Sequence, residues 1–179
     1  MGSIKNQQVV MRPQDLVVLI KLAVRQNDSF TYSGVGRELY MSASEIHGSL
    51  GRARLARLVT DTEGDGARVA RELLREFMLH GARFAFPPVS GSLTRGMPTA
   101  YAGPILREQL IMPNEPPPVW PHTKGSVRGM ALHPLYPSVP RAAERDPKLY
   151  EALSLFDAIR IGAAREREIA SAALSKTLE

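Results

Sequence analysis

Residues 38–54 read ELYMSASEIHGSLGRAR, and this stretch carries the most informative pattern in the chain. Ser42-Ala43-Ser44-Glu45 fits a capping box, in which the serine hydroxyl accepts from the amide of the glutamate and the glutamate side chain accepts from the amide of the serine. The pattern predicts a helix that begins immediately after Ser42. Ile46 and Leu50 lie four residues apart and give this helix one apolar stripe.

Two helical segments are predicted before it. Residues 13–26, PQDLVVLIKLAVRQ, are apolar around most of a helix circumference, which predicts a largely buried helix opened by Pro13 and ended by Asn27-Asp28-Ser29. Residues 33–40 predict a short second helix. The positions expected to be buried in the second and third helices are Val35, Leu39, Met41, Ile46 and Leu50. This spacing suits two short helices that cross at a steep angle over the first.

Residues 31–46, TYSGVGRELYMSASEI, resemble the helix-turn-helix of bacterial transcription regulators, and they are most similar to the winged-helix regulators of the MarR type. The shared pattern is a small residue where the helices cross, an apolar residue before the turn, and a Ser-x-Ser/Thr-x-apolar start of the recognition helix. The chain departs from it with Gly36 at the crossing, Tyr40 in the turn and Ser49 at a later apolar position. The resemblance covers residues 13–59, and residues 83–102 match only as a wing hairpin.

The resemblance implies that the third helix enters the major groove of double-stranded DNA. Its outer side would carry small and polar residues, and its glycines would let a phosphate approach closely. Glu45 has two available roles, capping the helix or accepting from a cytosine amine, and we favour capping. Arg95, at the tip of a loop over residues 90–96, would be the wing arginine. The predicted DNA-binding residues are Ser42, Ser44, Glu45, His47, Gly48, Arg52, Arg54 and Arg95.

Beyond Gly51 the apolar stripe is lost. At about 100° per residue Leu55 lies opposite Ile46, whereas Arg57 falls on the same face as Ile46. One uniform helix over residues 43–59 would therefore bury different faces in its two halves. We expect the helix to end, turn or meet a second subunit within ARLARLV, residues 53–59, and we do not count Arg57 as a DNA contact.

The middle of the chain has weaker patterns. Residues 60–67, TDTEGDGA, have the composition of a loop, and residues 68–80 predict a fourth helix stopped by Gly81. Residues 83–86 predict a short strand, residues 87–96 a turn-rich loop, and residues 97–102 the returning strand.

Residues 103–141 hold nine of the 14 prolines, which predicts an extended or looped segment with Trp120 packed on the domain. Asp146-Pro147 predicts the start of a helix running to about Leu178, roughly 45 Å long and longer than one small core can bury. The sequence thus predicts a mainly α fold: a winged-helix domain with a short β-hairpin over residues 1–102, a Pro-rich segment over 103–145, and a C-terminal dimerisation helix over 146–179.

Composition narrows the function. The net charge is +5, with 18 arginines and five lysines, which weakly favours a polyanionic partner. Without cysteine there is no disulfide, thiolate zinc site or cysteine nucleophile. We identify neither a Walker loop nor a nucleophile elbow, and Glu76 and His80 have no third metal ligand placed near them. We therefore expect neither an enzyme nor a cofactor or metal site.

The start of the chain has no signal-peptide core and no apolar run approaches a membrane span, so we expect a cytoplasmic protein. The leading hypothesis is a homodimeric, sequence-specific regulator of transcription that binds double-stranded DNA. The alternative is an antitoxin-like or complex-bound subunit that uses the helix-turn-helix as a scaffold for a protein partner. A third hypothesis is a ligand-responsive regulator with a pocket under Trp120.

Overall fold

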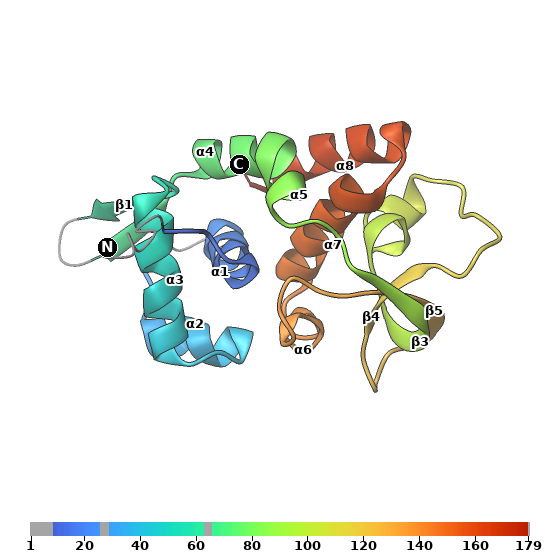
Figure 1. The fold of residues 1–179 in the computed structure, drawn as a ribbon, viewed down its shortest axis with the longest axis horizontal. Coiled ribbons are helices and arrows are strands. Elements are labelled where there is room, and N and C mark those ends of the chain that lie inside the picture. Colours follow the sequence, from blue (N-terminus) through green and yellow to red (C-terminus); the bar gives the residue numbers. More distant parts are fainter. Residues whose placement is uncertain (1–8, 26–28, 63–65, 179) are drawn as a thin grey trace, which may run out of the picture.

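A computed structural model of the chain describes residues 9–25, 29–62 and 66–178 (Figure 1). About half of these residues are helical, and the strands form an antiparallel hairpin and a separate closed sheet. The fold is therefore mixed α and β, which corrects the prediction of a mainly α fold. Asn27 and Asp28, where we predicted the end of the first helix, lie outside the described residues.

The first helix, α1 (Pro13–Ala23), is surrounded by the rest of the fold. Every residue from Asp15 to Ala23 is buried, which confirms the prediction of a largely buried helix. Figure 1 shows α1 between α3 (Ala43–Leu55) and α7 (Pro147–Ile161). The apolar circumference of α1 thus joins the N-terminal and C-terminal parts of the chain in one core.

A tight turn joins α2 (Tyr32–Leu39) to α3. Tyr40 adopts a left-handed conformation with φ 55°, and the Met41 amide donates to the Gly36 carbonyl at 2.8 Å. A Cβ atom on Gly36 would lie 2.6 Å from the Met41 carbonyl oxygen, so only glycine fits this crossing as it stands. The predicted apolar positions are all buried: Val35, Leu39, Met41, Ile46 and Leu50.

The third helix ends within the predicted stretch, and a hairpin follows it directly. Arg57 has φ 61° and turns the chain into β1 (Val59–Thr62), which pairs antiparallel with β2 (Gly66–Val69). The prediction of a loop over 60–67 is therefore wrong for its described residues, and the helix predicted over 68–80 begins only at Arg71. Valines and threonines flank the glycine-rich centre of this stretch, and the buried side chain of Val59 anchors the first strand.

The predicted strand at residues 83–86 is also wrong, because the helical run continues through it. Helix α4 (Arg71–Glu76) leads through a π-helical turn, η1 (Phe77–Gly81), into α5 (Ala82–Ala85). The buried positions, Leu74, Met78 and Ala82, recur every four residues across Gly81. This continuing apolar stripe holds the chain in a helix past the glycine that we expected to end it.

The closed sheet contains β3 (Ser90–Pro98), β4 (Pro118–Pro121) and β5 (Val127–Leu132). Strand β3 pairs antiparallel with both others, and β4 and β5 run parallel. The prediction of a loop over 87–96 is wrong for most of its length. The glycine that suggested a loop is required by close packing: a Cβ atom on Gly96 would lie 2.2 Å from the Trp120 carbonyl oxygen.

The segment between β3 and α7 is irregular, as predicted, but not wholly without helix. Short 3-10 turns lie at η2 (Ala100–Ala102) and η3 (Leu106–Glu108). Residues Val139–Ala143 form α6, which corrects the prediction that the Pro-rich segment is not helical. Pro140 lies in the first turn of α6, where a missing amide costs the helix no hydrogen bond.

The predicted C-terminal helix begins where expected but is two helices. The Asp146 side chain accepts from the Leu149 amide at 3.1 Å and caps α7. The chain breaks at Gly162, which has ψ 157° and no room for a Cβ beside the Ala158 carbonyl, and α8 (Ala164–Thr177) folds back against α7. The predicted single helix of about 45 Å does not form, so the length of the C-terminal helix no longer argues for a dimer contact there.

A buried carboxylate joins α7 to the sheet. Asp157 accepts from Trp120 Nε1 at 2.6 Å, Thr99 Oγ1 at 2.8 Å and Arg160 at 2.8 Å. Burial raises the pKa of Asp157, and the Arg160 charge and the donated hydrogen bonds oppose that shift. Trp120 is 1% exposed, which confirms it as a packing residue.

Candidate nucleic-acid interface

The outer face of α3 is open. Ser44 and His47 are exposed, Gly48 and Gly51 are partly exposed, and the opposite face of the helix is buried. A Cβ atom on Gly51 would meet no atom within 4 Å, so this part of the face is uncovered by the described chain. Ser44, His47 and Gly48 therefore occupy the side on which the sequence placed them.

The predicted capping box begins α3. The Ser42 amide donates to Glu45 Oε2 at 2.8 Å, and the Glu45 amide donates to Ser42 Oγ at 3.2 Å. The second oxygen of Glu45 accepts from the Tyr136 hydroxyl at 2.5 Å. Tyr136 first, and then Ser42, lower the pKa of Glu45 by donating hydrogen bonds to its carboxylate. Glu45 therefore has the capping role that we favoured.

Arg52 faces inward, which corrects its placement on the outer face of the helix. Its Nε and Nη2 donate to both oxygens of Asp15 at 2.8 Å and 2.6 Å, and the Asp15 side chain is fully buried. The same carboxylate accepts from the Arg12 amide at the start of α1. A bidentate pair of this kind fixes the orientation of both groups. Arg52 thus holds α3 against α1 through Nε and Nη2, while its Nη1 lies 3.4 Å from the place of a Cβ on Gly48.

Arg54 connects three elements around the exposed face. Its Nε donates to Asp61 of β1 at 2.7 Å, and Asp61 and then Tyr32 raise the pKa of Arg54 by accepting hydrogen bonds from it. The Tyr32 ring of α2 meets the His47 ring edge-on, with 5.4 Å between the ring centroids. These contacts set the positions of α2, α3 and the hairpin relative to one another.

The hairpin is the feature that sequence reasoning placed wrongly. It follows α3 after a short turn, where Arg57 is exposed and makes no ion pair with any described residue. Projection of one helix through residue 59 puts Arg57 on the Ile46 face, which is why it is not among the predicted DNA contacts, but α3 ends at Leu55. The β-branched residues at 59, 60 and 62 were the signal that could have identified the first strand.

Arg95 does not join this group. It lies in β3, opposite Arg128 of β5, and not at the tip of a loop. Figure 1 shows β3 and β5 at the other end of the molecule from α3 and β1. The structure therefore brings the predicted residues of the third helix together, with Arg52 turned inward, and places Arg95 in a different sheet.

The C-terminal part of the chain supports the α2–α3 turn from behind. Ser138 Oγ donates to the Leu39 carbonyl at 2.6 Å, and the Arg141 guanidinium stacks over the Tyr40 ring, 3.8 Å from its centroid. Lys21 of α1 pairs with Glu38 of α2 and with Asp146, the cap of α7. The turn that sets the direction of α3 is thus held by side chains from α1 and from the segment around α6.

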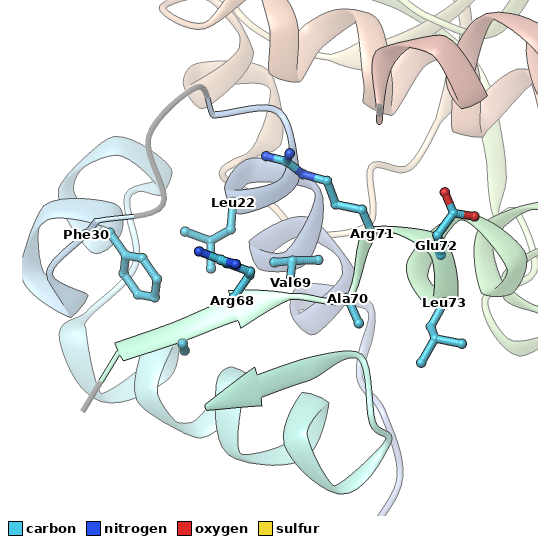
Figure 2. Close-up of a pocket in the computed structure, with 9 residues that line it drawn as sticks. Leu22, Phe30, Arg68, Val69, Ala70, Arg71, Glu72 and Leu73 are labelled. Carbon is cyan, nitrogen blue, oxygen red and sulfur yellow. The ribbon is translucent and has the colours of Figure 1, made fainter. Parts of the chain in front are cut away.

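A groove of about 420 Å³ lies behind the hairpin, between β2, the end of α1 and the start of α4 (Figure 2). Leu22 and Val69 form its apolar floor, and Phe30 lies at one side. Arg71 at its rim donates to the Arg25 carbonyl at 3.2 Å. Within the described ranges no group of three His, Asp or Glu side chains is placed to hold a metal ion. Nor does that part of the chain contain a helix long and apolar enough to cross a membrane.

No protein-family model matches the chain, and neither a curated protein nor a solved structure shows significant similarity to it.

Proposed function

We propose that the chain is a winged-helix regulator of transcription that binds double-stranded DNA, with α3 in the major groove and the β1–β2 hairpin as its wing. The observation that carries the proposal is the outer face of α3, where Ser44 and His47 are exposed and Gly48 and Gly51 are partly exposed, followed by the exposed Leu55 at the end of the helix. The small residues at the centre of that face let a helix lie deep in a groove about 12 Å wide.

The hairpin supports the proposal. It lies immediately after α3, and Arg54 and Asp61 connect the two elements. A wing in this position lies beside the recognition helix and can follow the DNA backbone or enter the adjacent minor groove. This hairpin replaces residues 83–102 as the wing, and Arg57, at its base, replaces Arg95 as the cation near the backbone.

The roles of the predicted residues divide accordingly. Ser44 and His47 would read base edges, and the first amides of α3 would contact a phosphate. Ser42, Glu45 and Arg52 would position the helix, because each of these side chains already bonds to another residue of the chain. Two chains that bind the half-sites of one pseudo-palindrome would place their α3 helices about 34 Å apart.

Selection of duplexes from a random pool, followed by fluorescence anisotropy, tests the proposal. His47→Ala is expected to weaken binding to the selected duplex by about 1–3 kcal/mol and to relax its sequence preference. His80→Ala is the matched control, because His80 is an exposed histidine on another helical segment. If His47→Ala and His80→Ala weakened binding to the selected duplex equally, a role of α3 in sequence recognition would be refuted.

The proposed contact between Arg57 and the DNA backbone has its own test. Arg57→Ala is expected to weaken binding to all sequences alike and to lower the slope of log affinity against log salt by about one. Arg165→Ala, an exposed arginine on α8, is the control for net charge. If the pool yields no enriched duplex, and the protein instead co-purifies with a partner at fixed stoichiometry, the alternative of a protein-interaction subunit holds.

A further inference from the structure

The outward face of the β3–β5 pair carries two matched cross-strand pairs. Leu93 lies directly opposite Met130, and Arg95 lies directly opposite Arg128. Leu93 and Met130 are each 43% exposed, and both arginines are exposed. Like charges directly opposite on a sheet are unfavourable, and no carboxylate among the described residues pairs with either arginine. This face combines exposed apolar surface with uncompensated positive charge.

A loop at the same end of the molecule has the complementary composition. Residues 108–115 read EQLIMPNE, with Ile111 99% exposed and Met112 42% exposed between Glu108 and Glu115. Figure 1 shows this loop, in yellow, projecting beyond β4 and β5. Both glutamates are exposed, so the loop presents two carboxylates on either side of two apolar side chains.

The loop itself carries no positive charge. Its only charged residues are Glu108 and Glu115, both exposed, and the nearest arginine, Arg107, precedes it. The charge that the projecting part of the loop offers to a partner is negative.

We propose that the 108–115 loop of one copy of this chain docks on the β3–β5 face of a second copy, with Ile111 and Met112 against Leu93 and Met130 and the glutamates facing the arginine pair. Because the loop and the face lie at one end of the same chain, a two-fold axis allows the contact to be made twice, which closes the assembly as a dimer. The proposal does not depend on DNA binding. It moves the dimer contact from the C-terminal helices to the end of the molecule away from α3, so the two α3 helices of this dimer would not lie on adjacent half-sites.

The charge pattern permits a swap experiment on the full chain without DNA. The variant R95E/R128E makes both its face and its loop negative, and the variant E108R/E115R makes both positive. Each variant alone is expected to dimerise at least about tenfold more weakly than the native chain in sedimentation equilibrium. An equimolar mixture is expected to regain native affinity as a heterodimer, because both of its contacts again join opposite charges.

Two controls make the result specific. R165E/K176E makes the same change of charge on exposed positions of α8, and it is expected to leave the dimer unchanged. Ile111→Ser is expected to weaken the dimer without any change of charge, and circular dichroism checks that each variant is folded. A monomeric native chain would overturn the proposal. So would a mixture that fails to associate, or a dimer lost only in R165E/K176E.

Discussion

Replacement of Arg52 by methionine is the sharpest test of how the recognition helix is held. Methionine keeps most of the apolar stem and removes the guanidinium that donates to both oxygens of Asp15. The Asp15 side chain has no exposed surface, so water cannot take the place of the lost donors. The Arg12 amide would be its one remaining donor among those described here.

The expected cost follows from that burial. Loss of one partner of a buried ion pair typically costs 3–5 kcal/mol, because an uncompensated charge remains inside the protein. Arg52 retains 19% exposure, so part of the pair is already solvated and the lower end, about 3 kcal/mol, is expected. For a chain of this length such a loss lowers the melting temperature by roughly 10 °C.

Urea unfolding followed by circular dichroism measures this cost, and a double-mutant cycle isolates the pair. In the Asp15→Asn variant the amide side chain still accepts from the Arg12 amide and carries no charge. Asp15→Asn combined with Arg52→Met should therefore cost less than the sum of the two single changes, and we expect a coupling energy of at least about 2 kcal/mol. A cost below 1 kcal/mol for Arg52→Met, or additive single changes, would refute the structural role of Arg52. At 20 °C the folded variant should keep the native salt dependence of DNA binding.

Two further predictions concern the α2–α3 turn. Tyr136→Phe should cost about 1 kcal/mol at pH 7 in urea unfolding, by removing the hydrogen bond to Glu45. The folded-state pKa of Glu45 is lowered, so this stabilisation is present above the unfolded pKa of about 4.5 and is lost as pH falls through the folded value; a cost that does not decrease as the pH is lowered below 4.5 would contradict the assignment. Gly36→Ala should destabilise by about 1–3 kcal/mol, because the new Cβ meets the Met41 carbonyl, whereas Gly51→Ala, with open space around it, should stabilise by about 0.5–1 kcal/mol. Thermal unfolding of the pair gives the two signs, and a shared sign would contradict the packing described for the turn.

Patterns confined to a few turns of chain predicted the starts and the burial of helices well. The capping box at Ser42, the apolar circumference of α1 and the cap at Asp146 each depend on residues within one helix, and each is confirmed. Capping and amphipathic spacing act over three or four residues, so the sequence contains all the information that they need. The apolar stripe of Ile46 and Leu50 is lost beyond Gly51, and this local pattern was also sufficient to locate the end of α3.

The strands were assigned wrongly because their composition is that of loops, and the partners of β3 are also distant in the sequence. Residues 60–67 and 90–96 are rich in glycine, serine and threonine, a composition typical of loops. In β3 the glycine at position 96 is required by Trp120, which follows 24 residues later in the sequence. A strand whose small residues make room for another strand has the same composition as a turn until the pairing is known.

The arginines mark the limit of sequence reasoning about the candidate site. The sequence places Arg52 and Arg54 around the outer face of α3 and Arg95 on a wing, and it leaves Arg57 out, yet the role of each arginine depends on residues outside its own helix or loop. Asp15, 37 residues away, withdraws Arg52 from the surface, and Asp61 on the hairpin orients Arg54. The helix ends before Arg57, which leaves Arg57 exposed in the turn that follows. Arg95 lies opposite Arg128 in a separate sheet. A guanidinium that has a buried carboxylate holds the fold together, and one that has none is free to bind an anion outside it. That distinction is why binding experiments on this chain should begin with Arg57, and association experiments with Arg95 and Arg128.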